Sequence, residues 1–492
     1  MTRSALPPVT HLATPRLTAG LDEHGWLDAA THRRVHGPLR PLPTDVLVQL
    51  VDDIQLTGRG GAGFPFGRKL RAVLESARRQ QRPPVVTVNG SESEPLSFKD
   101  KVLLTRAPHL VLDGAALAAD AIGASEIVVA VTDDEGAERS LRAALAERQM
   151  PVPTSVHVVP HRIVSGQSGA LVNGINGKKH IPPATSQRTS DAGVKSHPTL
   201  LSNAETYAQL AIAARRGPYG YTSLGLVDEP GTVLLTVTGA AARPAVMEVP
   251  TGTPLWRVLE LCHAPADAAV LTGGYEGTWI NPESALRATI SRAGFAAVGG
   301  TLGPGVIAPI GPDTCPLGEL AQVVHFLAAG STGQCGPCRL GLPDLARSVD
   351  LIVAGTAPTA LVEAAVEAVR GRGACGHPDA TARMSASALM VFAADIATHG
   401  ARHGCGRPVK GQLLVPPGPA DTNARLSVDW SRCDGHGLCA HVLPELVSLD
   451  ANGFPALPQS PVPVWLHGQA RRAVRMCPAL ALRLTTEGHH AA

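Results

Sequence analysis

The chain has 492 residues, which is enough for several domains at roughly 100 to 200 residues each. Its 43 lysines and arginines nearly balance its 41 aspartates and glutamates, so no strong field of one sign points to nucleic acid or to an anionic membrane. Apolar stretches such as 110–123 are interrupted by acidic residues and fall short of the roughly 18 residues that a membrane span needs. The start of the sequence lacks the apolar core of an export signal, so we expect a cytoplasmic protein with small-molecule or protein partners.

A glycine-rich segment, Leu-Thr-Gly-Arg-Gly-Gly-Ala-Gly-Phe-Pro, occupies residues 56–65. Glycine permits positive φ angles and lets a ligand approach the backbone amides. The apolar residues 70–74 indicate a helix, and the amides at a helix N-terminus favour an anion. The segment predicts a phosphate-binding loop, although taken alone it is equally compatible with an ordinary surface turn.

Strand-like and helix-like segments alternate after this loop. Apolar runs at 84–89, 126–132 and 156–159 indicate strands, and the segments 102–122 and 138–148 have helical spacing. Such alternation is typical of a parallel βαβ sheet, in which nucleotides bind at the carboxyl ends of the strands. The polar block 89–94 follows directly after one of these strands.

The pattern changes twice in the second half of the chain. From residue 231 the sequence consists of short β-rich pieces, and 316–399 is rich in alanine and leucine with helical spacing. A segment rich in proline and glycine, 415–423, indicates a linker. The sequence therefore predicts an α/β domain, a small β module, a helical bundle and a further C-terminal domain.

Six of the nine cysteines fall into two groups, which favours metal binding over disulfides in a chain without an export signal. The groups are Cys335, Cys338 and Cys375 in the bundle, and Cys433, Cys439 and Cys477 near the C-terminus. Cys262, Cys315 and Cys405 lie outside them, and we expect each to be a small buried apolar residue.

Ordered blocks along 56–400 resemble the flavin-bearing, NADH-binding (51 kDa-type) subunit of respiratory complex I and its relatives in soluble hydrogenases and formate dehydrogenases. The blocks are the glycine-rich loop, Val-Asn-Gly-Ser-Glu-Ser-Glu-Pro at 88–95, Ser-Gly-Gln-Ser-Gly-Ala-Leu at 165–171, Pro-Thr-Leu-Leu-Ser-Asn-Ala-Glu-Thr at 198–206 and Gly-Gln-Cys-Gly-Pro-Cys-Arg at 333–339. Several ordered blocks are far more specific than any one of them.

The resemblance implies an FMN site, with NAD(P)H as the donor. It assigns Glu94 a catalytic role and gives the following cofactor-binding residues: Gly58, Arg59, Gly60, Gly61, Ala62, Gly63, Phe64, Lys69, Asn89, Glu92, Ser93, Glu94, Gly166, Asn203 and Thr206. It also implies an iron–sulfur cluster in the bundle, held by Cys335, Cys338 and Cys375.

The sequence departs from this family at two sites. Thr332 stands where the family has its first cluster cysteine, so the cluster would be 3Fe-4S, or 4Fe-4S with Thr332, water, His377 or Cys405 at the fourth iron. At the nucleotide side Gln167 and Ser168 replace two glutamates, Ser91 replaces an aspartate, Ile163 an aromatic residue, and Ala72 a phenylalanine. Fewer carboxylates would relax discrimination against NADPH, whereas loss of the aromatic clamp would weaken binding of any nicotinamide nucleotide.

The segment Cys433-Asp-Gly-His-Gly-Leu-Cys439, followed by Cys477-Pro478, is similar to the single-cluster ferredoxins of bacterial cytochrome P450 systems. His436 stands where such runs have a middle cysteine. Three thiolates favour a 3Fe-4S cluster, and ligation of a fourth iron by His436 is the alternative.

We therefore predict the following domains: an N-terminal extension (1–45), an FMN-binding α/β domain (46–228), a β-grasp module (229–312), a helical iron–sulfur bundle (313–412), a linker (413–424) and an α+β ferredoxin (425–492). In the favoured function, an NAD(P)H dehydrogenase passes electrons from FMN through the bundle cluster and the fused ferredoxin to a redox protein, such as a cytochrome P450 or a haem-bearing membrane reductase. The alternative is an electron-transfer or scaffold subunit that no longer oxidises nicotinamide nucleotides.

Overall fold

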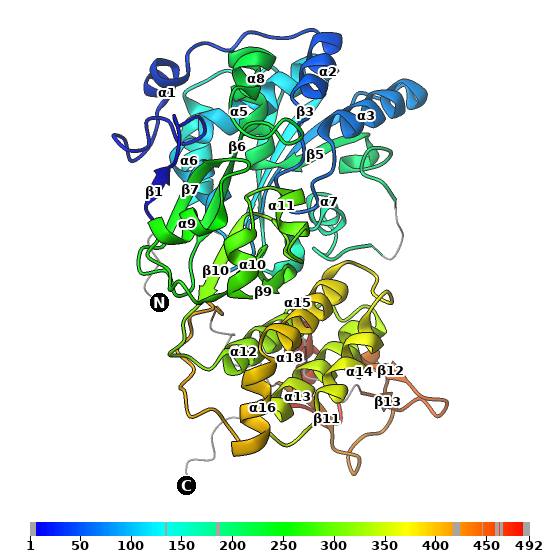
Figure 1. Cartoon of the computed structure of the whole chain (residues 1–492). Coiled ribbons are helices and arrows are strands. Elements are labelled where there is room, and N and C mark those ends of the chain that lie inside the picture. Colours follow the sequence, from blue (N-terminus) through cyan, green and yellow to red (C-terminus); the bar gives the residue numbers. More distant parts are fainter. Residues whose placement is uncertain are drawn as a thin grey trace. The chain divides into compact units, whose positions relative to one another are not determined.

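The computed structural model describes residues 6–132, 135–183, 187–416, 424–444, 446–457, 462 and 466–485. The chain forms two compact units (Figure 1). The first comprises Met1–Thr314 with Pro408–Leu414, and the second comprises Cys315–Arg407 with Val415–Ala492.

A four-stranded parallel sheet in the order β4-β3-β2-β5 forms the centre of the first unit. Its strands are β2 (Val85–Gly90), β3 (Glu126–Thr132), β4 (Thr154–Val159) and β5 (Thr199–Asn203). Helices α3 (Phe66–Gln80), α4 (Lys99–Arg106), α5 (Pro108–Ile122), α6 (Glu135–Ala146), α7 (Ser168–Ile175) and α8 (Ala204–Thr222) accompany the sheet. The valines of β2 and β3 are buried on both faces, as is typical of a parallel sheet with helices on each side. The predicted βαβ arrangement is confirmed.

The single helix predicted over 102–122 is wrong. The structure has two helices, α4 and α5, which are bent by 92° at Ala107. Pro108 occupies the first turn of α5, where its missing N–H costs nothing, but its ring disfavours helical φ and ψ angles at the residue before it. The helical spacing continues across the break because the apolar run 102–104 of α4 leads into the apolar residues of α5.

The first unit also contains a six-stranded mixed sheet, β1-β7-β6-β10-β8-β9. The strands are β1 (Val9–His11), β6 (Thr232–Val237), β7 (Ala245–Pro250), β8 (Ala269–Thr272), β9 (Thr278–Ile280) and β10 (Val306–Ile310), with helices α9 (Leu255–Leu261), α10 (Pro282–Arg287) and α11 (Arg292–Ala296). Strand β1 pairs in parallel with β7. The buried Glu248 of β7 accepts the backbone amides of Arg16, Leu17 and Thr18 at 3.0 to 3.1 Å, so the start of the chain is anchored on this sheet. Helices α1 (Ala29–His36) and α2 (Thr44–Asp53) come after this anchored segment in the sequence.

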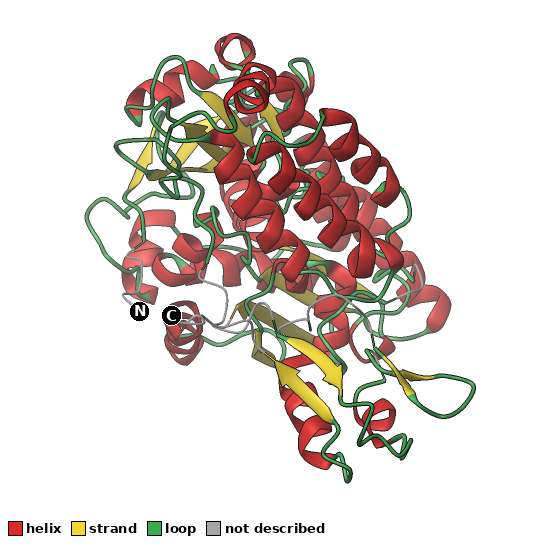
Figure 2. Ribbon diagram, turned by 90° about the horizontal axis from the view of Figure 1, so that it is seen from below, coloured by secondary structure: helices red, strands yellow, loops and turns green. Residues whose placement is uncertain are grey.

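The second unit contains a helical bundle. It is built from α12 (Pro316–Ala329), α13 (Leu342–Val353), α14 (Thr359–Val369), α15 (His377–Val391) and α16 (Ala393–Arg402), with a π-helical turn at Pro337–Gly341. Figure 2 shows the helices of the chain in red and its strands in yellow. The predicted helical bundle over 316–399 is confirmed.

The C-terminal part of the second unit has two small antiparallel ladders. Strand β11 (Arg425–Val428) pairs with β14 (Leu482–Thr485), and β12 (Ser448–Leu449) pairs with β13 (Pro455–Ala456). Helices α17 (Leu438–Val442) and α18 (His467–Met476) complete it. Among the described residues, its apolar core draws on positions 426–484 alone, including Leu426, Leu443, Val462, Ala470 and Leu482.

Within the described residues, no single helix has both the length and the apolar character to cross a membrane. The bent pair of α4 and α5 meets those two criteria together, and α5 is buried along almost its whole length.

Candidate functional site

The predicted flavin residues meet at the carboxyl ends of β2 and β5. Asn89 and Asn203 are the last pair in register between these neighbouring strands. The glycine-rich loop lies against them, since a Cβ atom on Gly60 would be 3.1 Å from the Cβ of Asn203. Asn203 also caps α8 by accepting the amide of Glu205 at 3.1 Å. The carboxyl ends of the strands therefore bring together three blocks that are far apart in the sequence: the glycine-rich loop and the segments around Asn89 and Asn203.

Two contacts fix the loop itself. The amide of Arg59 donates to Oγ1 of Thr206 at 3.0 Å. Arg292, from α11, donates to the carbonyl oxygens of Gly61 at 2.7 Å and Gly58 at 3.1 Å. A Cβ on Gly63, which has φ of 63°, would lie 2.4 Å from the Arg292 guanidinium, so this close approach requires glycine.

Sequence reasoning missed Arg292, because it belongs to a short helix 229 residues after Gly63 and lies in no recognisable motif. The buried guanidinium of Arg59, for which the resemblance predicts cofactor binding, instead lies 3.7 Å from the Glu229 carboxylate and contacts the carbonyl of Thr232. Arg59 therefore stabilises the loop, and Arg292 adds a cation beneath it.

Lys69 projects from the second turn of α3 toward β5. Its Nζ donates to the carbonyl oxygen of Leu201 at 2.7 Å, two residues before Asn203. Burial lowers the pKa of this amine to about 8. A phosphate beside it would favour the charged form, because an opposite charge stabilises an ammonium.

A buried ionic cluster orients the amide of Asn203. Lys99 is 1% exposed, and its Nζ lies 2.9 Å from Asp100, 3.0 Å from Glu205 and 3.2 Å from Oδ1 of Asn203. Nδ2 of Asn203 donates to Asp100 at 2.6 Å. Burial opposes the charge on Lys99, but the surrounding carboxylates outweigh it and raise its pKa above the usual range. The positions of O and N in this amide are therefore set by charged neighbours.

Two glutamates that follow β2 have different environments. Glu92 accepts the amides of Asp100 at 3.1 Å and Lys101 at 2.8 Å, so it holds the start of α4. Glu94 accepts the amide of Tyr275 at 2.9 Å and that of Leu96 at 3.3 Å. Burial raises the pKa of Glu94 to about 8, against the lowering effect of these amides. Burial raises the pKa of Glu92 as well, and Glu94 is a carboxyl group suited to hold a proton near neutral pH.

The segment predicted to face the nucleotide lies beside the same strand end. Asn89 donates to the carbonyl of Gly166 at 2.8 Å, and a Cβ on Gly166 would be 3.1 Å from the backbone oxygen of Ser91. Ser93 contacts the carbonyl of Ile163 at 3.4 Å. The substituted positions 91, 163, 167 and 168 therefore belong to one region. Phe64, in the glycine-rich loop, has a side chain that is 49% exposed.

The three bundle cysteines converge at the π-helical turn. Burial, together with the neighbouring Cys335 and Cys375, raises the pKa of Cys338 to about 11. Oγ1 of Thr332 lies 3.8 Å from Sγ of Cys338, at the place where a fourth ligand would stand. Nε2 of the buried His377 is bonded to Leu327 O at 2.8 Å, and its Nδ1 has no hydrogen-bond partner within the described residues. Three thiol groups in this arrangement fit an iron–sulfur cluster with one corner that lacks a thiolate.

The cysteines of the C-terminal domain also come together. Burial raises the pKa of Cys439 in α17, with contributions from the nearby Cys433 and Cys477. Sγ of Cys477 accepts the amide of Ala481 at 3.3 Å, a contact that suits a thiolate ligand. The side chain of His436 is exposed. This donor set fits a cluster held by three cysteines.

The remaining cysteines differ from one another. Cys262 is buried in the core of the six-stranded sheet, as predicted. Cys405 is one of the candidates for a fourth ligand of the bundle cluster, but the structure groups it with Cys315 and His399 instead. Cys315 is buried, as predicted, whereas Cys405 is partly exposed and so differs from that prediction.

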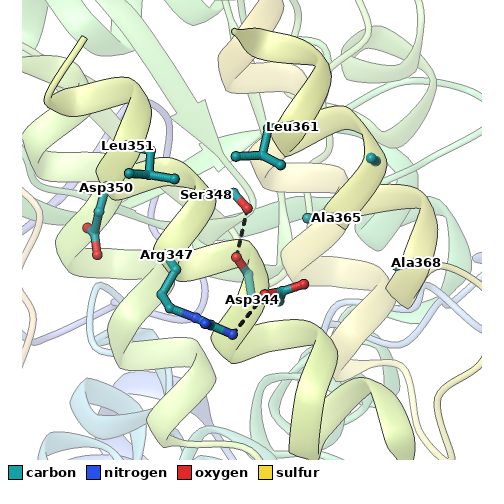
Figure 3. Close-up of a pocket in the computed structure, with 9 residues that line it drawn as sticks. Asp344, Arg347, Ser348, Asp350, Leu351, Leu361, Ala365 and Ala368 are labelled. Atoms are coloured by element: carbon teal, nitrogen blue, oxygen red, sulfur yellow. Dashed lines mark hydrogen bonds and ion pairs between the residues drawn. The ribbon is translucent and has the colours of Figure 1, made fainter. Parts of the chain in front are cut away.

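A groove in the bundle is lined by none of these residues (Figure 3). Leu351 and Leu361 line it from α13 and α14. Its polar groups bond to one another, since Arg347 pairs with Asp344 at 2.8 Å and Ser348 donates to the carbonyl of Asp344. The groove therefore contains none of the predicted cofactor ligands.

Comparison with known families assigns three segments of the chain. Residues 51–212 match the Nuo51 FMN-binding domain. Residues 319–399 match the NADH-ubiquinone oxidoreductase-F iron-sulfur binding region, and residues 426–484 match the 4Fe-4S single cluster domain. These matches coincide with the three sites described above.

Relatives with known names cover most of the chain. The F 2 subunit of NADH-quinone oxidoreductase from Rhizobium meliloti (strain 1021) is 28% identical over 391 residues, which are 75% of this chain and 92% of the relative. The alpha subunit of the NAD-reducing hydrogenase HoxS of Cupriavidus necator is 28% identical over 331 residues, 64% of this chain and 54% of that protein. The crystal structure of an NAD+-reducing [NiFe]-hydrogenase in the H2-reduced state is similar with a TM-score of 0.70 at 27% identity, covering 82% of this chain and 68% of that chain.

The resemblance drawn from the sequence is therefore confirmed. The chain carries a Nuo51 FMN-binding domain, the iron–sulfur region of NADH-ubiquinone oxidoreductase F and a C-terminal 4Fe-4S domain, and its homologues are the F subunits of NADH-quinone oxidoreductase and the HoxS alpha subunit.

Proposed function

We propose that the protein oxidises NAD(P)H and passes the electrons singly, through the bundle cluster and the C-terminal cluster, to a partner redox protein. The observation that carries this proposal is the meeting of the glycine-rich loop, Asn89 and Asn203 at one end of the sheet, in a chain that also groups three cysteines at each of two places. Its relatives are named as an NADH-quinone oxidoreductase and an NAD-reducing hydrogenase, and these names support the same reaction class.

Different residues of the first unit would bind the phosphate and the ring of FMN. The amides of the loop, Lys69 and the cation of Arg292 suit the phosphate, because backbone N–H groups and positive charges bind anions. The amides of Asn89 and Asn203 suit the polar edge of the ring. FMN, when bound, supplies hydride acceptance and the release of electrons one at a time.

Glu94 would serve as a proton-holding group beside the reacting part of the site. Its carboxyl group is buried, so it keeps a proton up to about pH 8. The amides of Leu96 and Tyr275 fix its position. A carboxyl group whose pKa lies close to the working pH is suited to exchange a proton with a substrate.

The domain organisation supports passage of electrons inside one chain. The order β7-β6-β10-β8-β9, with β6 and β10 parallel, supports a β-grasp module over 229–312. The helical bundle at 313–412 and the ferredoxin at 425–492 would then carry one cluster each. A short linker at 413–424 raises the local concentration of the fused acceptor to about the millimolar range.

The alternative function is an electron-transfer or scaffold subunit without nucleotide oxidation. The observation that favours it is the replacement of the acidic and aromatic residues of the nucleotide region by Ser91, Ile163, Gln167 and Ser168. Ile163 is aliphatic, so it offers no aromatic face to an adenine, and its side chain is buried. This alternative requires flavin or clusters that are reduced by a partner instead of by NAD(P)H.

Anaerobic titration of the purified protein separates the two. In the proposed function, NADH or NADPH bleaches the flavin absorbance, and the comparison of the two nucleotides identifies the donor. Bleaching by dithionite but by neither nucleotide would favour the alternative. Absence of releasable flavin after anaerobic reconstitution would contradict both the FMN site and the proposal.

The relatives support other redox subunits as the partner class. They are named as components of NADH-quinone oxidoreductase and of an NAD-reducing hydrogenase. They give no support to a cytochrome P450, which only the C-terminal resemblance suggests. The partner would then receive electrons from the cluster of the C-terminal domain.

A further inference from the structure

Three residues of the second unit, none of them a member of either cysteine triad, form a compact donor group. Cys315 precedes the first residue of α12, His399 lies in the last turn of α16, and Cys405 follows that helix. Their ligand atoms, two sulfurs and one imidazole nitrogen, all lie within 4.8 Å of one another. His399 is 2% exposed and Cys315 is 4% exposed, whereas Cys405 is partly exposed.

The hydrogen bonds around this group prepare it for a metal ion. Nδ1 of His399 is 2.6 Å from the carbonyl oxygen of Val353, so the proton of the neutral ring is on Nδ1 and the lone pair of Nε2 is free to coordinate. A ligating histidine commonly donates its other N–H to such a carbonyl. Sγ of Cys315 accepts the amide of Gly318 at 3.3 Å, in the capping position where serine, threonine or aspartate is usual.

The distances suit a single ion of zinc size. In a tetrahedron with Zn–S of about 2.3 Å and Zn–N of about 2.0 Å, sulfur and nitrogen are about 3.6 Å apart. Nε2 of His399 lies 3.4 Å from Sγ of Cys315. Ligands of an iron–sulfur cluster bind different irons and stand farther apart, so this group is too tight for a cluster.

We propose that Cys315, His399 and Cys405 bind one Zn²⁺ ion, with a water molecule in the fourth position. Two thiolates and a neutral imidazole balance the charge of the ion and match the soft ligands that zinc prefers. The partly exposed Cys405 leaves one side of the site open to the water. This site shares no residue with the predicted flavin site or with either cysteine triad, and it does not depend on the proposed function.

The ion would join the two ends of the bundle. Cys315 stands at the start of its first helix, and His399 and Cys405 stand at the end of its last. The end of α13 packs tightly against α16, because a Cβ on Gly355, which has φ of 67°, would lie 2.1 Å from the carbonyl oxygen of His399. The ion pair of Arg407 with Asp395 holds the segment after Cys405 to α16. A metal ligand set here stabilises the bundle by linking segments about 85 residues apart, since binding is coupled to folding.

Zinc K-edge X-ray absorption of the full chain tests the proposal, because iron does not contribute at that edge. Protein purified anaerobically with added zinc and then dialysed should hold about one zinc per chain, with two sulfur neighbours at about 2.3 Å and nitrogen or oxygen neighbours at about 2.0 Å. A zinc shell of three or four sulfurs would place the ion among the cluster cysteines and overturn the proposal. A disulfide between Cys315 and Cys405 in protein kept reduced, found by mass spectrometry without zinc, would also overturn it.

Substitutions assign the ligands. Loss of an outer-shell partner weakens zinc binding about 10- to 100-fold, so Cys315→Ser, His399→Gln and Cys405→Ser should each weaken it by at least about 100-fold in competition with a chelator. Cys262→Ser, a buried cysteine of the first unit, and Cys335→Ser, in the cluster triad, should both keep the zinc. Retention of zinc by all three ligand variants would overturn the proposal, and the absorption spectrum of the wild type decides the case if a variant fails to fold.

Discussion

The orientation of one amide illustrates how this chain builds a binding site at the scale of single residues. Asn203 receives a hydrogen bond from Lys99 and gives one to Asp100, and both partners are buried. Reversing the amide would face Nδ2 with an ammonium and Oδ1 with a carboxylate, so only one orientation is stable. The ionic cluster therefore presents Asn203 to a ligand in a fixed orientation.

Gly60→Asp should prevent flavin binding. A Cβ at this position already lies 3.1 Å from Asn203, and the carboxylate would add a negative charge where a phosphate is expected. Two like charges about 4 Å apart repel by about 1 to 4 kcal/mol, which weakens binding about 5- to 1,000-fold. Fluorescence titration with FMN measures this change.

The matched control is Gly25→Asp. A Cβ on Gly25 meets nothing within 4 Å, so the same charge is added in open space and FMN affinity should stay at the wild-type value. Unchanged affinity in Gly60→Asp would show that the phosphate lies elsewhere.

Glu94 should make stability depend on pH in the apoprotein. Its pKa is raised from the ordinary 4.5 to about 8 by burial, so between these values the folded state holds a proton that the unfolded state releases. The contribution of Glu94 to the free energy of unfolding is fully present below about pH 4.5. It is lost as the pH rises toward about 8, with a slope approaching 1.4 kcal/mol per pH unit. Thermal unfolding between pH 5 and 8 should show a falling midpoint, and Glu94→Gln should flatten this fall (~1.4 kcal/mol per pH unit).

Glu283→Gln, at an exposed carboxylate of α10, is the control for that measurement and should keep the wild-type dependence on pH. An equal slope in Glu94→Gln and in the wild type would mean that another buried group causes it.

At the scale of elements, the sequence predicts what depends on local pattern. Strand β3 has the bounds that its sequence predicts, because a run of apolar residues ended by polar ones leaves little choice. The break at Pro108 escapes prediction because the periodicity of α4 and α5 is continuous. Arg292 and the group of Cys315, His399 and Cys405 depend on contacts between distant segments, for which neither spacing nor composition gives a signal.

Thr332→Cys should convert the bundle cluster into a stable 4Fe-4S centre. Thr332 lies next to Cys338, and a thiolate there would supply the missing fourth ligand. The added negative charge stabilises the oxidised form, so the reduction potential should fall. Mössbauer and electron paramagnetic resonance spectra, taken in chains without the C-terminal domain, should change from a 3Fe-4S or labile 4Fe-4S signature to a stable 4Fe-4S signature.

Thr356→Cys supplies the control, because it adds a thiol at an exposed position after α13 and should leave the spectra unchanged. If neither the wild type nor Thr332→Cys holds iron in the bundle, then Cys335, Cys338 and Cys375 are not cluster ligands.

The C-terminal domain should fold and bind a cluster when it is produced alone from Ala424 onward. The described residues of its apolar core all lie within 426–484, and β11 pairs with β14, which joins the two ends of the domain. Small metal domains couple binding to folding, so Cys433→Ser, Cys439→Ser and Cys477→Ser should each cost both iron and structure. Iron analysis and circular dichroism of the fragment measure the two losses.

His436→Ala distinguishes the cluster type in the same fragment. With a 3Fe-4S cluster held by three thiolates, this exposed histidine is not needed, and about three irons per fragment should remain. Loss of one iron from a starting value of about four would identify His436 as a ligand. A well-folded fragment without iron or sulfide would contradict the ferredoxin assignment.

At the scale of the whole molecule, the combination of domains implies an order of electron transfer. The FMN-binding domain, the iron–sulfur region and the 4Fe-4S domain follow one another along the chain. If the bundle cluster lies between flavin and ferredoxin, its removal should leave the first step intact and slow the second. Cys338→Ala removes a buried cysteine that is a predicted ligand of that cluster and leaves the predicted flavin residues unchanged.

In stopped-flow measurements with NADH or NADPH, Cys338→Ala should therefore bleach the flavin at the wild-type rate. Reduction of the C-terminal cluster should become at least about tenfold slower, equivalent to about 1.4 kcal/mol in the barrier. Cys262→Ala, in the core of the six-stranded sheet, should leave both rates unchanged. Equal rates in Cys338→Ala and in the wild type would mean that electrons pass directly from the flavin to the ferredoxin, and the bundle would then be a support for the two redox domains and not a step between them.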